Sequence, residues 1–328
     1  MKKALVIGID DYRDAPLRGC VNDASALALV LESNGDGSPN FSVRTLKSDD
    51  GDVTGAALHE AVADLFKGDA ETALLYFAGH GMLNPDTNAG YIVGSDGRRG
   101  AWGLALAEIL DLANRAHPRI MSSVIILDSC HSGYAGEMAG LPAGAASVIG
   151  TGVTILTASQ RDGKAEEGLR HGLFTEILLD GLAGGSSDIC GNVTPASLYA
   201  HIDQTLGPWE QRPVYKANVQ SFVTLRQVAP KVPLEVLRRL PTYFPDRASI
   251  YALDPSYEED RGNSPELDHI PVDPEHARIF KELQRCNRHG LVMPVDTEFM
   301  YYAAIKSTGC RLTALGAHYR KLAELKRI

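Results

Sequence analysis

The chain has 328 residues, of which 44% are hydrophobic and 22% are charged, and its formal net charge is −9. This composition is typical of a globular protein with one large domain, or with a medium domain and a smaller one. No apolar stretch approaches the roughly 20 residues that cross a bilayer, and the negative charge disfavours broad nucleic-acid binding. We therefore expect no membrane partner and no nucleic-acid partner.

The N-terminal sequence MKKALVIGIDDY combines two lysines with a short apolar run. Asp10 and Asp11 end that run before it reaches the roughly 7–15 residues of a signal-peptide core, so we expect a first strand and a cytoplasmic protein. The five cysteines are odd in number and lack CxxC spacing, which disfavours both a disulfide framework and a zinc site. We expect neither a metal nor a cofactor.

Short apolar runs alternate with amphipathic stretches through the first two-thirds of the chain. Continuous apolar character indicates strands that are covered on both faces, as in a mainly parallel sheet. The predicted strands are 4–9, 41–46, 72–78, 122–128, 152–159 and 221–225, and the predicted helices are 23–34, 55–66, 104–116 and 172–184. This alternation predicts a three-layer α/β domain over residues 1–228.

The sequence changes character after residue 228. Residues 229–272 are rich in Pro, Asp, Glu and Arg without clear periodicity, which predicts a linker or an extended arm. Helical periodicity resumes over residues 273–328, which predicts a small helical domain of about three helices.

Two residues with catalytic chemistry follow strands of the predicted sheet. His80 stands between two glycines after the apolar run LLYFA, and Cys130 comes two residues after the strand that ends at Asp128. Because functional residues collect at the carboxyl ends of parallel strands, the two side chains can meet at one edge of the sheet. An imidazole that takes the proton of a thiol makes the sulfur a nucleophile for acyl transfer. The N–H groups of Gly81 and Cys130 are candidates for the oxyanion hole.

Each residue of this pair also has a structural interpretation. A lone histidine between glycines is often a turn residue, and a lone cysteine is often a small core residue. Their joint appearance after two strands favours the catalytic interpretation. His131 is an alternative base, but a sequence neighbour of Cys130 generally points away from it.

Four motifs in a fixed order carry a family resemblance. YFAGHG and DSCHSG, preceded by ALVIGIDDY and LRGCVNDA, resemble the caspase-like cysteine peptidases, and specifically the metacaspase and bacterial caspase-like branch. The later segments TILTAS and GLFTEILLDGL extend the likeness to about residue 225. The resemblance implies the caspase-hemoglobinase fold, with His80 as general base and Cys130 as nucleophile.

The resemblance also implies a primary specificity pocket. Its lining would come from Cys20, Asp23, Ala78 and Asp128. Two carboxylates in a partly closed pocket favour a substrate Arg or Lys, whereas the caspases that cut after Asp use basic residues there and carry a QACRG-like motif that this sequence lacks. Apart from the family, each of these residues has a structural interpretation as an alternative: Asp23 as a helix N-cap, Asp128 as a turn cap and Cys20 as a packing residue.

The sequence departs from the family pattern in two places. Ala78 stands where many metacaspases have Ser, so one polar group of the usual pocket is missing. Calcium-activated members carry an adjacent Asp pair after the histidine strand, whereas the comparable region here reads WGLALAEILD. Asp96 in VGSDG fits a calcium site, but a dedicated site needs further ligands, and we expect another trigger.

The C-terminal segment contains an aromatic and basic mixture that is suited to stacking and anion contacts. Its members are Tyr301, Tyr302, Lys306, Arg311, His318, Tyr319 and Arg320. Bacterial proteins with this peptidase domain resemble immune effectors, as in antiviral defence, whose appended domains hold the protease idle. That likeness implies activation by a nucleotide-derived second messenger or by a partner protein. The plainer interpretation is a helical cap with a small core of Phe280, Leu283, Met300 and Leu315.

The sequence thus predicts a regulated cysteine endopeptidase that cleaves protein substrates after Arg or Lys. The alternative from another class is a catalytically silent caspase-like scaffold that acts by binding partners. A peptidase that acts only on itself is a third hypothesis, with Arg161, Lys164 and Arg170 as internal cut sites.

Overall fold

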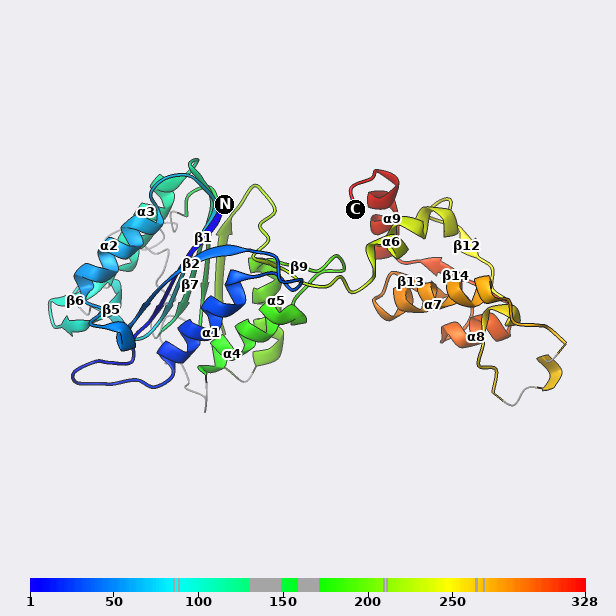
Figure 1. Ribbon diagram of the computed structural model, residues 1–328, viewed down its shortest axis with the longest axis horizontal. Coiled ribbons are helices and arrows are strands. Elements are labelled where there is room, and N and C mark those ends of the chain that lie inside the picture. Colours follow the sequence, from blue (N-terminus) through cyan, green and yellow to red (C-terminus); the bar gives the residue numbers. More distant parts are fainter. Residues whose placement is uncertain are drawn as a thin grey trace. The chain divides into compact units, whose positions relative to one another are not determined.

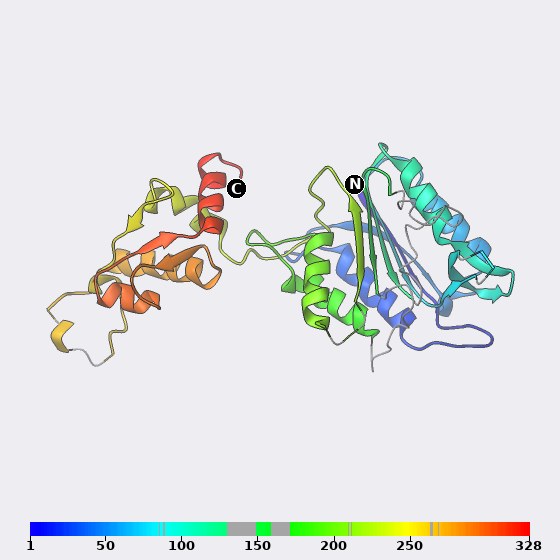
Figure 2. The ribbon, with the colours of Figure 1, turned by 180° about the vertical axis from the view of Figure 1, so that it is seen from behind.

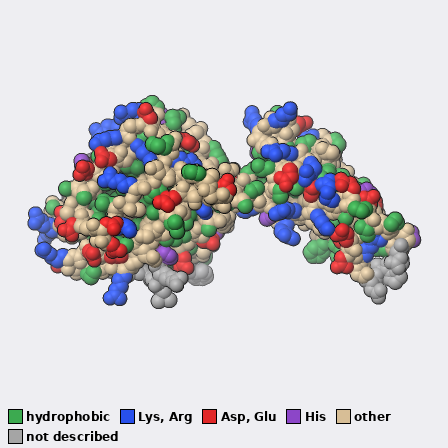
Figure 3. Space-filling view, viewed as in Figure 1, with side chains coloured by type: hydrophobic (Ala, Val, Ile, Leu, Met, Phe, Trp, Pro, Cys, Tyr) green, Lys and Arg blue, Asp and Glu red, His purple; other side chains and the backbone are tan. Residues whose placement is uncertain are grey.

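The computed structural model describes most of the chain, which divides into two compact units, Met1–Ala229 and Pro230–Ile328. The described residues are 1–84, 86–87, 89–129, 149–158, 171–208, 210, 212–262, 265–267 and 269–328. In this described part, every helix is too short or too polar to span a bilayer. On the face drawn in Figure 3, acidic and basic side chains are interspersed over each unit, so the charge of that face is mixed.

A six-stranded sheet forms the centre of the first unit (Figure 1). Its strand order is β10-β8-β7-β3-β1-β2, and every pairing is parallel except that of β10, the antiparallel edge strand. The bounds are β1 Lys2–Gly8, β2 Phe41–Lys47, β3 Ala70–Ala78, β7 Ile120–Asp128, β8 Val153–Thr157 and β10 Val214–Asn218. The mainly parallel sheet that the apolar runs predict is confirmed.

Helices cover both faces of this sheet (Figures 1 and 2). One face carries α1 (Cys20–Glu32), α4 (Leu173–Asp180) and α5 (Pro195–Leu206), and the other carries α2 (Gly55–Leu65) and α3 (Leu106–Ala116). Neighbouring strand residues therefore enter different cores: Leu75 packs with α2 and α3, whereas Tyr76 packs with α1, α4 and α5. Burial on both faces explains the continuous apolar runs, and the three-layer architecture is confirmed.

A second, antiparallel sheet follows β3 in the first unit. Its order is β4-β5-β6, with β4 at Gly81–Leu83, β5 at Gly90–Arg98 and β6 at Ala101–Ala105. Sequence analysis missed these strands because β4 is short and glycines interrupt the apolar pattern of the other two. A short pair, β9 (Asn192–Val193) with β11 (Arg226–Gln227), and two single turns, η1 (Ser48–Asp50) and η3 (Gly181–Gly185), complete the unit.

The edge of the main sheet differs from the prediction. The predicted strand 221–225 is not a strand, and β10 occupies the edge instead. An edge strand is covered on fewer sides, so the half-exposed sequence VYKAN lacks a continuous apolar run. Val223 and Leu225 are apolar because they are buried in the core beside α1, α4 and α5. The helix predicted over 172–184 ends at Asp180, where η3 begins.

The second unit combines helices with a small sheet. Its helices are α6 (Leu234–Tyr243), α7 (Pro274–Arg288), α8 (Met300–Ile305) and α9 (Ala314–Glu324), with short turns η4 (Pro255–Tyr257) and η5 (Pro265–Leu267). The antiparallel sheet β12-β14-β13 consists of Ile250–Tyr251, Cys310–Leu312 and Val292–Pro294. We expected a linker or extended arm over 229–272, but α6 and β12 lie in that range. Pro241 inside α6 obscured its helical pattern.

Candidate active site

His80 lies just beyond the carboxyl end of β3, beside the end of β7. The two strands are neighbours, with Ala78 paired to Asp128, and the Gly79 N–H donates to the Asp128 carbonyl at 3.3 Å. The start of the motif DSCHSG is therefore next to YFAGHG at one edge of the sheet. Cys130 itself lies outside the described residues, as do His131 and the predicted internal cut sites Arg161, Lys164 and Arg170.

The imidazole ring of His80 is held by two contacts. Its Nε2 lies 2.7 Å from the carbonyl oxygen of Ala15. Since a carbonyl only accepts, Nε2 carries a hydrogen, and in the neutral ring Nδ1 keeps its lone pair. The ring also packs on Tyr12, with 4.5 Å between ring centroids and 56° between the planes. This tautomer makes Nδ1 the nitrogen that can accept a proton from a thiol.

The main chain of His80 is held as well. Its N–H donates to the Tyr12 hydroxyl at 3.0 Å, and its carbonyl accepts from the Val93 N–H at 2.9 Å. Sequence analysis did not single out Tyr12 or Ala15 for this site. Both follow β1, and the quoted motif ALVIGIDDY, which ends on Tyr12, was the signal that could have drawn attention to them.

The register of β4 and β5 bears on the predicted oxyanion hole. Gly81 pairs with Ile92, one position after the opposed residues His80 and Val93. Hydrogen-bonded and non-hydrogen-bonded pairs alternate in an antiparallel ladder, so the Gly81 N–H is turned away from β5. Because β4 is the edge strand of its sheet, this N–H points out of the β4-β5 ladder, and its role as an oxyanion donor stays a prediction.

The structure brings Asp23 and Asp128 together beside Gly172. A Cβ placed on Gly172 would lie 3.0 Å from Asp128 Oδ2 and 3.5 Å from Asp23 Oδ2, and the Gly172 N–H donates to Asp23 Oδ2 at 3.2 Å. Burial raises the pKa of Asp23. Burial, reinforced by the charge of Asp23, raises the pKa of Asp128 to about 6. Two carboxylates thus share a partly enclosed space.

Each carboxylate has a partner from the start of α4 or the residues before it. His171 Nδ1 lies 2.6 Å from Asp23 Oδ1, and the Thr175 hydroxyl donates to Asp128 Oδ2 at 2.6 Å. Because the Thr175 hydrogen is used in this way, the Tyr76 hydroxyl, 2.6 Å from Thr175 Oγ1, is the donor in that contact. Sequence analysis missed these roles, although the motif GLFTEILLDGL contains Thr175.

Cys20 and Ala78 complete the predicted pocket. Burial raises the pKa of the Cys20 thiol well above its usual range, and the charges of Asp10, Asp128 and Asp23 raise it further, so Cys20 lies among these carboxylates as a neutral thiol. Ala78 ends β3 opposite Asp128 and is buried. Ala78 carries no hydroxyl, and the hydroxyl that donates to Asp128 comes from Thr175.

Asp10 caps α1 in place of Asp23. Its two carboxylate oxygens accept from the N–H groups of Cys20 at 2.9 Å and Val21 at 3.2 Å. The helix begins at Cys20, so Asp23 lies inside the first turn, and its interpretation as the N-cap is wrong. The carboxylate of Asp23 is thereby directed to the pocket.

Candidate metal ligands do not gather in the described part of the chain, where no group of three or more His, Cys, Asp or Glu side chains could hold a metal ion. Asp96, the residue that fits a calcium site by sequence, accepts from the Gly55 N–H at 2.8 Å.

The predicted sensing residues are spread over the second unit. Tyr301 and Tyr302 lie on α8 and Lys306 follows it; Arg311 lies on β14; and His318, Tyr319 and Arg320 lie on α9. Tyr319 is buried, and the Arg320 guanidinium donates to the carbonyls of Phe244 and Pro245. These two side chains therefore support the fold. Lys306 Nζ lies 5.2 Å from the Tyr302 ring centroid, and Tyr302, Arg311 and His318 are exposed.

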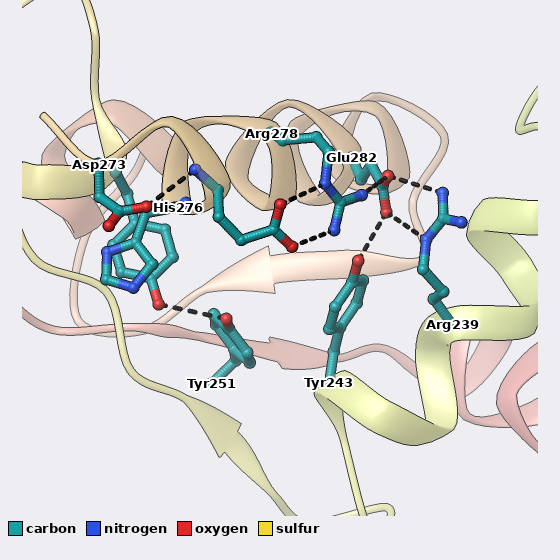
Figure 4. A network of polar contacts seen from close by, with 9 residues as sticks. Arg239, Tyr243, Tyr251, Asp273, His276, Arg278 and Glu282 are labelled. Carbon is teal, nitrogen blue, oxygen red and sulfur yellow. Dashed lines mark hydrogen bonds and ion pairs between the residues drawn. The ribbon is translucent and has the colours of Figure 1, made fainter.

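A polar network links α6 with α7 in the second unit (Figure 4). Glu282 accepts from Arg239 at 2.7 and 3.0 Å, from Tyr243 at 2.7 Å and from Arg278 at 2.5 Å. The Glu282 side chain is only 12% exposed, and a carboxylate that far from water needs such partners. The network therefore has a structural role, and its two arginines are already paired.

Comparison with known proteins identifies the family and the fold of the first unit. The caspase domain family matches residues 1–223. The chain is similar in structure to protein GSU0716 from Geobacter sulfurreducens, with a TM-score of 0.51 and 17% identity over 70% of this chain and 97% of that one. It also aligns with caspase-1 from Spodoptera frugiperda, with a TM-score of 0.48 and 12% identity over 69% of this chain and 90% of that one. No curated protein matches the chain.

Proposed function

Because the chain belongs to the caspase domain family, a family of cysteine peptidases, we propose that it is a cysteine endopeptidase with Cys130 as nucleophile and His80 as general base. One observation carries this proposal above the others. The Ala15 carbonyl takes the Nε2 hydrogen of His80 and so leaves Nδ1 as the acceptor. That ring lies at the sheet edge where β7 ends, two residues before Cys130.

In the proposed acylation step, His80 Nδ1 takes the proton of the Cys130 thiol as the sulfur attacks the substrate carbonyl carbon. The carbonyl oxygen becomes an oxyanion, for which the N–H groups of Gly81 and Cys130 are the donors. The imidazolium then protonates the leaving amine as the carbon–nitrogen bond breaks. Water, deprotonated by His80, hydrolyses the thioester, which releases the acid and restores the thiol.

The acidic pocket supports cleavage after Arg or Lys. Asp23 is paired with His171, whereas the partner of Asp128 among the described residues is the neutral hydroxyl of Thr175. Asp128 is therefore the carboxylate that best fits a basic substrate side chain. An Arg guanidinium can donate two parallel hydrogen bonds to one carboxylate, which an ammonium does not, so we propose Arg in preference to Lys.

A panel of fluorogenic peptides tests this function. The peptides differ only in having Arg, Lys or Asp before the cut bond, and the proteins are the wild type and Cys130→Ala. We expect the wild type to prefer Arg over Lys and to leave Asp uncut, and Cys130→Ala to be inactive with an unchanged circular dichroism spectrum. Turnover by Cys130→Ala refutes the nucleophile, and faster turnover of the Asp peptide refutes the pocket.

We also propose that the second unit regulates this activity in a bacterial defence setting, with a nucleotide-derived second messenger or an activating protein as its trigger. The support is the exposed pair of Tyr302 and Lys306, which suits stacking and anion contacts. Isothermal titration with a panel of cyclic nucleotides tests the first trigger. Absence of binding to every member favours the activating protein.

A further inference from the structure

The ladder between β4 and β5 is irregular at His80. His80 and Val93 oppose each other one position before the bridge of Gly81 and Ile92. Such a hydrogen-bonded pair normally exchanges two direct N–H to C=O bonds. Here only the Val93 N–H to His80 carbonyl bond is direct, at 2.9 Å.

The second bond of this pair passes through Tyr12. The His80 N–H donates to the Tyr12 hydroxyl at 3.0 Å, and that hydroxyl donates to the Val93 carbonyl at 3.2 Å. A hydroxyl has one hydrogen to give and lone pairs to accept with, so Tyr12 can serve both strands at once. Burial raises the pKa of Tyr12 far above its usual value, which keeps the phenol protonated and able to donate.

The surroundings leave room for this hydroxyl and for little else. Tyr12 is only 8% exposed. A Cβ on Gly79 would lie 2.5 Å from the Tyr12 hydroxyl and 2.8 Å from the Phe77 ring, distances that real Cβ atoms do not adopt. The aromatic ring of Tyr12 then packs on the imidazole of His80. One side chain thus contacts both the peptide and the ring of His80.

We propose that Tyr12 is the positioning residue of His80, which fixes the peptide plane of the base through the relayed hydrogen bond and its ring through the aromatic contact. The loop that carries Tyr12 also carries Ala15, so a single segment after β1 sets both the orientation and the tautomer of the imidazole. Tyr12 acts through His80, and its kinetic consequence rests on the proposed peptidase function.

Two substitutions of Tyr12 separate its two contacts. Tyr12→Phe keeps the ring and deletes the relay, and Tyr12→Leu deletes both. Because a displacement of about 1 Å costs on the order of 100-fold in rate, we expect kcat for the Arg peptide to fall about 10- to 100-fold in Tyr12→Phe and further in Tyr12→Leu. KM should stay within about twofold, since no pocket carboxylate has a hydrogen bond to Tyr12 among the described residues.

The control is Tyr215→Phe, the same replacement on β10, where the ring stacks on Tyr199. We expect its kcat and KM to equal those of the wild type. Active sites are counted by labelling with an arginine chloromethylketone, so that kcat refers to folded enzyme alone. If the rate loss in Tyr12→Phe disappears after this correction, Tyr12 has only a structural role and the inference is overturned.

A second readout needs no turnover. Iodoacetamide alkylates Cys130 at neutral pH, and mass spectrometry follows the rate. This rate measures how strongly a neighbouring proton acceptor activates the thiol. We expect a slowing of about tenfold in Tyr12→Phe, with the buried thiols Cys286 and Cys310 as internal references. An unchanged rate in that variant overturns the inference.

The two failures can be told apart. If the wild type cuts no peptide but its Cys130 is alkylated much faster than in His80→Ala, the proposed peptidase function is wrong and the Tyr12 comparison still stands. If Cys130 reacts equally fast in the wild type and in His80→Ala, the histidine does not activate the thiol, and the inference about Tyr12 falls with it.

Discussion

The contacts that hold His80 and the acidic pocket lie at the same edge of the sheet, but they are made by different kinds of groups. Neutral groups hold His80: the Ala15 carbonyl, the Tyr12 hydroxyl and the Val93 N–H. Ionisable groups meet in the pocket, where Asp23 contacts His171 and lies close to Asp128. The contacts that orient the base therefore do not change with pH, whereas the charge of the pocket does. In the proposed peptidase, a change in the charge of the pocket would therefore leave the contacts of His80 in place.

Removing the base is the largest expected perturbation. His80→Ala should lower kcat for the Arg peptide about 10³- to 10⁴-fold, because general base catalysis and thiol activation are both lost. KM should not change, since the pocket carboxylates keep their partners. Steady-state kinetics measure both constants, with the enzyme concentration set by absorbance and the fold checked by circular dichroism. A variant that loses affinity instead of rate would show that the two regions are not separate.

Neutralising the pocket should act on selectivity. Asp128→Asn keeps an acceptor for the Thr175 hydroxyl but removes the anion. We expect kcat/KM for the Arg peptide to fall about 100-fold, as happens when one partner of a desolvated charge pair is lost. The matched peptide with citrulline, which is neutral, should be cut at an unchanged rate. Equal losses for both peptides would place Asp128 in the catalytic step.

Acid should also reduce the preference of the pocket for the Arg peptide. Burial raises the pKa of Asp128 to about 6, so its anion is present above that pH and is lost below it. The ratio of kcat/KM for the Arg and citrulline peptides should fall about fivefold between pH 6 and pH 5, as the ionised fraction of a single group with a pKa of about 6 does. Taking the ratio cancels any pH dependence that the two peptides share. In Asp128→Asn the ratio should be flat, and a slope that survives there would point to another group.

The smallest expected effect belongs to Thr175. Thr175→Val deletes the hydroxyl that contacts Asp128, and we expect KM for the Arg peptide to rise about threefold to tenfold, the scale of the net contribution of one ordinary hydrogen bond. That hydrogen bond lowers the pKa of Asp128, so its loss should move the acid midpoint of the Arg to citrulline ratio upward. Thr175→Ser should restore both values, and no response in either would remove Thr175 from the pocket.

Sequence reasoning could place residues that a local pattern marks. The apolar runs end beside His80 and Asp128, and the family resemblance of the motifs GCVND and DSCHSG grouped Asp23 with Asp128, which the structure brings close together. Tyr12 and Thr175 could not be assigned, because their roles arise from contacts with residues 68 and 47 positions away. Apolar periodicity predicts which face of an element is buried and gives no information about a hydroxyl that reaches across two strands.

The boundary of the second unit was missed for a related reason. α6 carries an internal proline, a residue that disfavours a helix when the sequence is read alone, and β12 has only two residues, too few for periodicity to be read. Their stability comes from partners that are distant in sequence, such as Glu282, which accepts from Arg239 and Tyr243 across about 40 positions.

The raised pKa of Asp128 has a consequence for selection. In the unfolded chain an aspartate titrates near about 3.9, so the native state binds this proton more tightly, and the Asp128 contribution to stability declines as pH rises from about 4 to about 6. At neutral pH the fold therefore carries a buried anion, and a neutral residue at this position would remove its desolvation cost. A domain that served only as a scaffold would gain stability if a neutral residue replaced Asp128. In the proposed peptidase, the requirement for a basic substrate side chain is what retains the carboxylate at this position.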